Sequence, residues 1–294
     1  MTINISVALT VYNGERYLTE QLQSIRDQEL LPFEIVIVDD CSADASAAII
    51  KDFDFGTIQC RYYKNEHNLG PVANFKKAIG LCTGNFIALC DQDDVWLPAK
   101  LKRLYEAMAV KNQWVPAVSF SDVSLTASNG TVIAASIFKE AWKIKPCNYT
   151  FKMLLIENVI IGCSCMINRK MQDEVLKMPT QGVMMHDHWI ALIGNTLGEA
   201  SFINEPLLLY RSHNASVTLK VPVTGLISKI KREFGIMHGY LEDNMQQAKQ
   251  FKEVYYKDLS IKDKRTLNRF LKLGKMPFLI KRLYTKTLKM YVNK

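Results

Sequence analysis

The sequence of 294 residues lacks several features that would place it in a common protein class. It contains no apolar run of the roughly 18 residues that a membrane-spanning helix requires. The first residues carry neither a basic start nor a cleavage motif, so we expect no secretion signal. A GxxxxGK[ST] phosphate loop and a GxGxxG dinucleotide motif are also missing. These absences argue against an integral membrane protein, a P-loop enzyme and a dinucleotide-binding enzyme of the usual kind.

Cysteine is present, but it is not arranged for cross-linking or for metal binding. The seven cysteines are odd in number, and none of them stands in a CxxC pair. Neither a disulfide framework nor a structural zinc site is therefore expected. Several cysteines lie inside apolar runs, where a reduced thiol acts as a small apolar side chain. This usage indicates a reducing compartment, and we expect a cytoplasmic protein.

The first 95 residues alternate between short β-rich runs and segments of helical spacing. The strands are expected at 5–11, 33–38, 60–64 and 85–90. The helices are expected at 15–27, 45–53 and 72–81. Such alternation builds a parallel sheet with helices on both faces, so we predict an α/β fold. Beyond residue 110 the pattern is less regular, with strands expected at 117–123, 130–134, 162–167 and 200–210 and helices at 151–158 and 187–197.

Three of the first four strands end in polar clusters, namely Thr10–Asn13, Asp39–Ser42 and Asp91–Asp94. Parallel sheets bind ligands beyond the carboxyl ends of their strands, which is where these clusters fall. Packed carboxylates repel each other and are best tolerated around a divalent cation such as Mg²⁺ or Mn²⁺. The alternative for the acidic cluster is a solvated loop that caps the next helix. For the Asp39–Ser42 cluster, contact with a ribose hydroxyl or a base N–H competes with capping of the following helix.

Four motifs in this order resemble the family 2 glycosyltransferases: VALTVYNG at 7–14, IVDDCS at 37–42, NLG at 68–70 and CDQDDVWLP at 90–98. The last motif is similar to the bacterial rhamnosyltransferase-like branch of surface-polysaccharide assembly. The resemblance covers about residues 3–215 and implies the GT-A nucleotide-sugar fold. It implies a nucleotide-sugar-binding half at 1–110 and an acceptor-binding half at 111–219, followed by a basic helical extension at 220–294.

The resemblance also implies roles for individual residues of the donor site. The positions expected to contact the nucleotide or its sugar are Thr10, Tyr12, Asn13, Asp39, Asp40, Asn68, Gly70 and Asp93. Asp94 is the expected metal ligand, although Asp91 leaves the register open by a residue or two. Mg²⁺ or Mn²⁺ is the expected cofactor.

In the acceptor half, Asp187 matches the catalytic base that the family places at the start of a helix. A carboxylate at this point can take the proton of an attacking sugar hydroxyl. The alternative is a helix cap by Asp187, and the flanking His186 and His188 are expected to be polar neighbours. Downstream, the Tyr-Arg-x-His segment implies that Arg211 pairs with the diphosphate and that His213 ligates the metal, unless this segment is a surface loop.

The sequence therefore predicts an inverting, metal-dependent glycosyltransferase. The donor would be a UDP- or dTDP-sugar, with dTDP-rhamnose and a UDP-hexose as candidates. The acceptor would be a glycan or lipid-linked glycan in cell-surface polysaccharide or lipopolysaccharide synthesis. Two alternatives are a nucleotidyltransferase that makes a nucleotide-sugar and a non-catalytic nucleotide-sugar-binding module. The nucleotidyltransferase would need a Gly-rich basic loop, whereas residues 10–16 contain one Gly and one Arg.

The C-terminal quarter is strongly basic, with 18 Lys and Arg against 6 Asp and Glu in residues 220–294. Amphipathic basic stretches at 226–234, 269–273 and 279–291 indicate contact with anionic lipid, on the inner face of the cell membrane. The alternatives are packing on the domain and pairing with another copy of the chain. Nucleic acid is not an expected partner, because no binding motif is present and the acidic sheet edge would repel phosphates.

Overall fold

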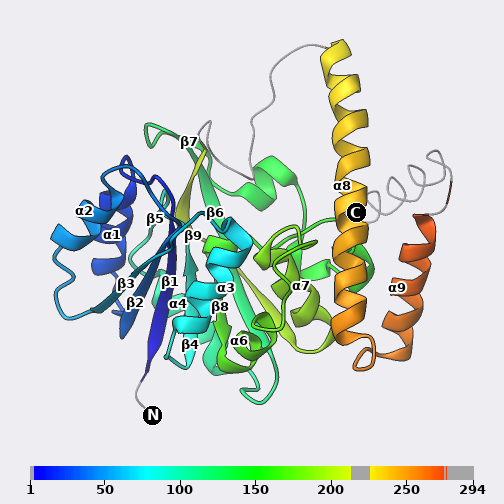
Figure 1. Cartoon of the computed structure of the whole chain (residues 1–294), viewed down its shortest axis with the longest axis horizontal. Coiled ribbons are helices and arrows are strands. Elements are labelled where there is room, and N and C mark those ends of the chain that lie inside the picture. Colours follow the sequence, from blue (N-terminus) through cyan, green and yellow to red (C-terminus); the bar gives the residue numbers. More distant parts are fainter. Residues whose placement is uncertain (1–2, 213–225, 275, 277–294) are drawn as a thin grey trace.

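The computed structural model describes residues 3–212, 226–274 and 276, and for residues 226–240 it describes the backbone alone. Nine strands of this described part form one sheet in the order β3-β2-β1-β4-β8-β6-β9-β5, with β7 paired to β6 (Figure 1). The strands are β1 (Ile5–Val11), β2 (Glu34–Asp39), β3 (Gln59–Lys64), β4 (Phe86–Cys90), β5 (Val95–Trp96), β6 (Ala117–Ala127), β7 (Val132–Ala134), β8 (Cys165–Asn168) and β9 (Glu199–Ser212). The α-helices are α1 (Leu18–Arg26), α2 (Ser46–Asp52), α3 (Pro71–Leu81), α4 (Lys100–Ala109), α5 (Phe151–Leu154), α6 (Arg169–Val175), α7 (His186–Thr196), α8 (Leu226–Tyr255) and α9 (Ile261–Leu273). Three short helical turns occupy Ile137–Trp142, Pro146–Asn148 and Gly162–Ser164.

The first four strands are parallel, as their alternation with helices predicts. All six residues of β2 are buried, which is typical of a strand covered on both faces. Leu9 of β1 lies opposite Ile37 of β2 and opposite Cys90 of β4. The carboxyl ends of these three strands therefore lie side by side, and their polar clusters meet at one edge of the sheet.

The second half of the sheet is mixed. β8 runs antiparallel between β4 and β6, whereas β9 runs parallel to β6 and pairs with β5 in the antiparallel sense. The positions of these strands agree with the sequence pattern, but their directions depend on the path of the chain and have no signature in periodicity. The sheet is continuous across residue 110, so the two halves expected from the sequence, 1–110 and 111–219, share one core.

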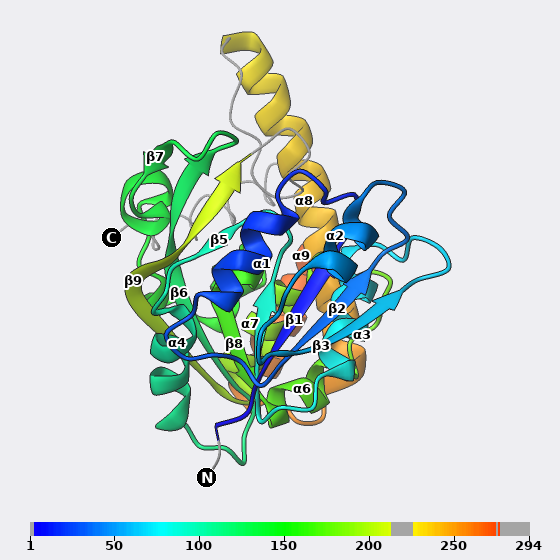
Figure 2. The same cartoon turned by 90° about the vertical axis from the view of Figure 1, so that its left-hand side faces the viewer.

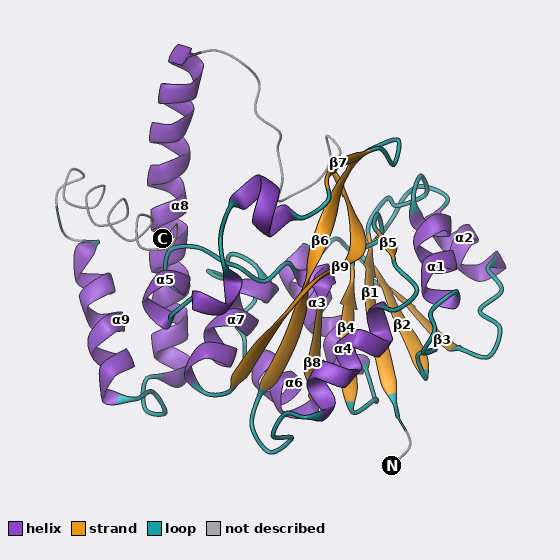
Figure 3. Cartoon of the chain, turned by 180° about the vertical axis from the view of Figure 1, so that it is seen from behind, coloured by secondary structure: helices purple, strands orange, loops and turns teal. Residues whose placement is uncertain are grey.

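Helices cover both faces of the sheet. α3, α6 and α7 contact one another on one face, and α1 and α4 lie on the other face, as a comparison of Figures 1 and 3 shows. α8 and α9 lie side by side beyond α7. Figure 2 shows that the amino-terminal part of α8 extends past the body of the domain on the side where β1 ends.

The described part of the C-terminal extension packs on the domain. The ring of Trp189 in α7 lies 5.3 Å from that of Phe251 and 5.9 Å from that of Tyr255, both in α8. All three side chains are buried, so this contact is part of the apolar core. Packing on the domain is thus observed for this part of the extension. Among the described residues, no helix combines the length and the apolar character needed to span a bilayer.

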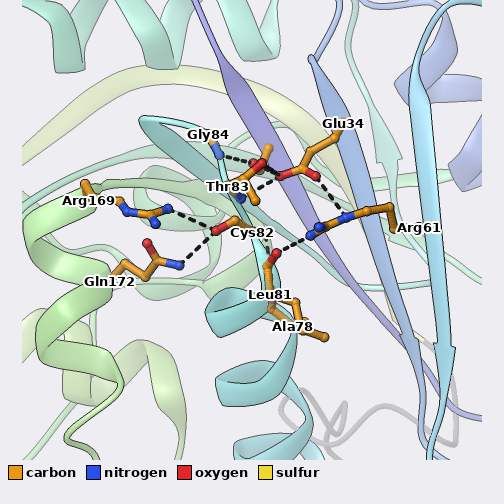
Figure 4. Close-up of polar contacts among 10 residues, drawn as sticks. Glu34, Arg61, Ala78, Leu81, Cys82, Thr83, Gly84, Arg169 and Gln172 are labelled. Carbon is orange, nitrogen blue, oxygen red and sulfur yellow. Dashed lines mark hydrogen bonds and ion pairs between the residues drawn. The ribbon is translucent and has the colours of Figure 1, made fainter.

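A buried polar network fixes the opposite edge of the sheet (Figure 4). Glu34, at the start of β2, accepts hydrogen bonds from the hydroxyl of Ser6 and from the N–H and hydroxyl of Thr83, and it lies 3.1 Å from Nε of Arg61. Burial alone would raise the pKa of Glu34, but these partners outweigh it and the pKa is lowered. Nearby, Arg169 of α6 donates to the carbonyl of Cys82 at 3.0 Å, which links the two halves of the domain.

Candidate active site

The loops that follow β1, β2 and β4 are held together by side-chain clamps. The amide of Gln92 accepts from the N–H of Tyr12 at 2.7 Å and donates to its carbonyl at 2.9 Å. The N–H of Asn13 donates to the hydroxyl of Ser42, and the Asn13 carbonyl oxygen Oδ1 accepts from the N–H of Ala43, both at 2.9 Å. The three polar clusters predicted from the sequence therefore form one connected rim.

Within this rim, the residues expected to line the nucleotide pocket are partly accessible. Thr10 is half-buried at the end of β1, and Tyr12 is 50% exposed beside Gln92. An exposed tyrosine ring at the end of a parallel strand offers a flat surface on which a base can stack. Asn13 adopts a left-handed backbone conformation with φ of 49°, which asparagine tolerates better than most residues.

The carboxylate of Asp39 is directed toward protein partners. It accepts from the N–H of Ser42 at 2.7 Å and from the hydroxyl of Tyr62 at 2.8 Å. Burial and the bond to Asp39 raise the pKa of Tyr62, which therefore remains a hydrogen-bond donor. The geometry gives Asp39 a positioning role at the tip of β2, and it adds no support for direct contact with the nucleotide.

The carboxylate of Asp40 is also held by protein groups. It accepts from the amide of Asn65 at 2.7 Å and from the N–H groups of Leu69 and Gly70 at 2.8 and 2.9 Å. Gly70 has φ of +79° and directly precedes α3, while Oδ1 of Asn68 accepts from its N–H. Asp40 thus holds the turn at 68–70 in place, and the contact with the base expected from the sequence has no support in this geometry.

The acidic cluster after β4 gathers around a buried thiol. Ligand atoms of Asp91, Asp94 and Cys163 all lie within 4.8 Å of one another. Asp94 is 1% exposed, and no N–H or O–H group of the described residues donates to its Oδ2, while the Cys163 thiol lies beside the carboxylate. Burial, followed by the charge of Asp93, raises the pKa of Asp94 to about 7. Burial and the charge of Asp94 likewise raise the pKa of Asp91 well above its usual value.

A buried, unpaired carboxylate oxygen is costly unless a cation compensates it. An oxygen-rich site with one open carboxylate suits Mg²⁺ or Mn²⁺, which keep several waters and bridge to substrate phosphates. The residues present therefore fit the divalent cation expected from the sequence. Asp94 offers the free oxygen, and Asp91 lies beside it.

Lys100 is a component of this site that the sequence pattern did not reveal. It is fully buried on α4, donates to the carbonyl of Cys163, and has its ammonium 3.4 Å from the ring centre of Trp96. Burial lowers the pKa of Lys100 to about 8. A lysine in this place supplies positive charge beside the carboxylates. The only signal in the sequence is that Lys100 begins the helix that follows the acidic cluster, six residues after Asp94.

Arg211 has a different environment from the one expected. Its guanidinium pairs with Glu20 at 2.6 Å, donates to the carbonyls of Asp93 and Ser128, and lies over the ring of Tyr17. The side chain is 6% exposed. These contacts attach the end of β9 to the acidic loop, so the pairing with a diphosphate has no support in this geometry. His213, the second ligand expected from this segment, lies outside the described residues.

Asp187 lies in the first turn of α7 and is held by groups from another segment. Its Oδ1 accepts from the amide of Asn158 at 2.9 Å and from the N–H of His188, and its Oδ2 accepts from the N–H of Gly162 at 3.0 Å. The residue is 8% exposed, and burial raises its pKa to about 7. A carboxylate with this pKa can accept a proton at neutral pH.

The two histidines beside Asp187 are buried structural neighbours. The ring of His186 stacks on Phe75 with centroids 3.8 Å apart, and Nε2 of His188 lies 2.5 Å from the carbonyl of Leu154. Burial lowers the pKa of His186 to about 3 and that of His188 to about 4. Both rings are therefore neutral at physiological pH.

Consecutive residues connect Asp187 to the acidic cluster. The N–H of Gly162 donates to Asp187, and the thiol of the next residue, Cys163, lies against Asp91 and Asp94. The charge of Asp187 also contributes to the raised pKa of Asp91. The carboxylates of β4 and α7, almost a hundred residues apart in sequence, thus face a common region.

A sheet of this topology, with an acidic cluster after the fourth strand and a carboxylate facing it from a later helix, defines the class of glycosyltransferases with the GT-A fold. The chain belongs to glycosyl transferase family 2, whose model matches residues 6–176. Enzymes of this family use nucleotide-sugar donors, so the class, the fold and the general activity expected from the motifs are confirmed.

Two relatives illustrate the similarity in sequence. The chain is 28% identical over 261 residues to an uncharacterized glycosyltransferase of Methanocaldococcus jannaschii. This alignment covers 86% of this chain and 83% of that protein. It is 23% identical over 245 residues to the UDP-Glc:α-D-GlcNAc-diphosphoundecaprenol β-1,3-glucosyltransferase WfgD of Escherichia coli, covering 81% and 87% of the two chains.

Two solved structures share the fold. TarS 1–349 of S. aureus in complex with UDP-GlcNAc has a TM-score of 0.55 at 17% identity and covers 91% of this chain and 79% of its own. The mannosyltransferase PcManGT of Pyrobaculum calidifontis in complex with GDP-Man and Mn²⁺ has a TM-score of 0.50 at 13% identity, with coverages of 97% and 84%.

Proposed function

We propose that the protein is an inverting, metal-dependent glycosyltransferase in which Asp187 is the general base. The observation that carries this proposal is the pair Gly162–Cys163, which joins the Asp187 carboxylate to the cluster of Asp91 and Asp94. A base and a cation site that face one common region are what a single displacement requires, since the attacking hydroxyl and the departing diphosphate lie on opposite sides of the same carbon.

In this mechanism Asp187 accepts the proton of the acceptor hydroxyl as that oxygen attacks the anomeric carbon of the donor sugar. The bond from this carbon to the diphosphate breaks on the opposite side, so the configuration inverts. Asn158 and Gly162 hold the carboxylate in the orientation that proton transfer needs. A divalent cation, when bound at Asp94, offsets the negative charge of the nucleoside diphosphate.

The donor site lies at the rim formed by the loops after β1, β2 and β4. Tyr12 and Thr10 are the candidates for contact with the nucleotide, with Asn13 on the same rim and Asn68 in the loop after β3, which Asp40 attaches to β2. Asp39 and Asp40 hold the backbone of the surrounding loops in place through hydrogen bonds. The structural relatives bind UDP-GlcNAc and GDP-Man, so a UDP-hexose stands beside dTDP-rhamnose as a candidate donor.

The acceptor is proposed to be a glycan or a lipid-linked sugar in surface-polysaccharide or lipopolysaccharide synthesis. The name of WfgD specifies a diphosphoundecaprenol-linked sugar as acceptor, which supports this class of substrate. A lipid-linked acceptor fits a cytoplasmic enzyme at the inner face of the membrane, and the basic residues of 220–294 favour that location. We propose in addition that residues 1–110 bind the nucleotide-sugar and that residues 111–219 bind the acceptor.

The test is to replace Asp187 with Asn and to measure metal-dependent release of the nucleoside diphosphate from a panel of nucleotide-sugars. We expect a loss of roughly 10²- to 10⁴-fold in turnover with unchanged nucleotide binding, because only the proton acceptor is removed. Asp173→Asn, on the exposed face of α6, is the matched control. Full turnover in Asp187→Asn would refute the assignment of the base.

A further inference from the structure

A cavity of about 410 Å³ that is open to solvent lies between α8 and the loop that leads into α7, and its Asp243 and Gln246 are exposed. It is lined by Gly182, Val183, Met184, Asp243 and Gln246. The first three belong to the loop, and the last two lie one turn apart on one face of α8. Ligand cavities in proteins begin at about this size, and one pyranose ring fits within it.

The loop is fixed to the helix, so the walls of the cavity are set by the fold. The N–H of Met184 donates to Oε1 of Gln247 at 2.9 Å. Gly182 has φ of +72°, and a Cβ at this position would come within 3.0 Å of the Gln246 amide. Only glycine combines this backbone conformation with so close an approach.

The same turn of α8 contacts both segments that hold Asp187. Asn244 donates to the carbonyl of Ile156 at 2.9 Å, two residues before Asn158, which donates to the Asp187 carboxylate. On the other side, Met184 precedes Asp187 by only three residues. The loop and the helix that line the cavity are therefore attached to both segments around the proposed base.

The chemistry of the lining favours a neutral sugar. Carboxylate and carboxamide groups, here Asp243 and Gln246, bind pairs of sugar hydroxyls as acceptors and donors. The negative charge of Asp243 disfavours a phosphate or another anion. The family model ends at residue 176, so the cavity is built from segments that follow the part of the chain matched by that model.

The geometry points to this cavity as the binding site for a neutral pyranose unit of the acceptor, which makes α8 a part of the acceptor site. The inference rests on the proposed function. It means that Asp243 and Gln246 of α8 contact the acceptor, whereas the later part of the helix packs on α7.

The inference is tested with methyl glycosides of glucose, galactose, N-acetylglucosamine and rhamnose as probes. Binding is measured by ligand-observed NMR on the full chain in the presence of UDP and Mn²⁺. We expect at least one glycoside to bind, Asp243→Asn to weaken it by about tenfold, and Gln246→Trp to abolish it by filling the cavity. Lys249→Ala, at an exposed position of the same helix, should bind as the wild type does.

The inference is overturned if no glycoside binds to a protein that still binds nucleotide, or if both cavity variants bind the glycosides as well as the wild type. Either result leaves the proposed function standing. Failure of the proposed function has a different signature, because then no nucleotide-sugar is turned over or stabilises the fold. Unchanged nucleotide binding in Asp243→Asn and Gln246→Trp separates the two cases.

Discussion

Replacement of Asp94 by Asn should make the metal-free protein more stable while removing its response to metal. The Asp94 carboxyl is buried with a free Oδ2, and its pKa is raised to about 7 by burial and by the charge of Asp93. Asn has the same shape, and its amide oxygen can still accept from the N–H of Arg211, which lies 3.2 Å from Oδ1. The substitution therefore removes mainly the buried charge.

The magnitude follows from the difference between the pKa of about 7 in the folded protein and the ordinary value of 3.8. Each unit corresponds to about 1.4 kcal/mol, which gives a ceiling of roughly 4 kcal/mol above pH 7. Asp91 and Asp93 share the repulsion with Asp94, so removal of one charge recovers only part of this ceiling. We expect the variant to be more stable than the wild type by about 2 kcal/mol. For a chain of this length that raises Tm by about 4 °C.

The pH dependence gives the sign of the effect. Below pH 4 the carboxyl holds its proton in both the folded and the unfolded state, so Asp94→Asn and wild type should be equally stable. Between pH 4 and 7 the unfolded chain releases this proton while the folded protein resists release, so the wild type loses stability relative to the variant. Thermal unfolding in EDTA at pH 4, 6 and 8 measures this difference.

Addition of Mn²⁺ at pH 8 should then raise the Tm of the wild type and leave that of Asp94→Asn nearly unchanged. Glu106→Gln, at a surface carboxylate of α4, controls for unspecific metal effects. The reasoning is refuted if the variant is less stable than wild type in EDTA at pH 8. It is also refuted if the difference between the two is the same at pH 4 and at pH 8.

Two further predictions concern other parts of the chain. Glu34→Ala should lower the free energy of unfolding by about 3 kcal/mol, because it leaves Arg61 and the N–H of Thr83 without their buried partner. Urea unfolding measures this loss, and unchanged stability would contradict the role given to the network. Transfer by the wild type should rise with pH up to about 7 and then level off, because Asp187 must be deprotonated to act as the base. A profile that is flat between pH 5.5 and 8 would contradict that role.

Local patterns predicted the parallel half of the sheet and the rim of the site. The alternation of β-rich and helical segments specifies the strands and their order of appearance, and the polar residues after each strand fall where such sheets bind ligands. Asp187 was selected by the resemblance to the family, and the structure places it at the start of an apolar helix, as expected. The acidic cluster at 91–94 was predictable because it follows a buried strand, whereas the choice of Asp94 within it came from the resemblance.

Contacts between distant segments were not predictable in the same way. The hydrogen bonding of Asp40 to Asn65 and to the turn at Gly70 depends on how the loops after β2 and β3 meet in space. The same holds for Lys100, which lies under the carboxylates only because α4 packs against β8. Residues such as these carry ordinary signals of strand, turn or helix in the sequence, and their partners emerge only from the path of the chain.

The central claim is that a cation and a nucleoside diphosphate meet at Asp94, next to the base. It is tested most directly by a crystal structure of the protein soaked with UDP and Mn²⁺, with diffraction data collected at the manganese absorption edge. The account predicts an anomalous peak within about 2.3 Å of Oδ2 of Asp94, bridged to the diphosphate, with Asp187 facing the same cleft. An ordered diphosphate whose Mn²⁺ lies away from Asp94, or on a surface that Asp187 does not face, would contradict it.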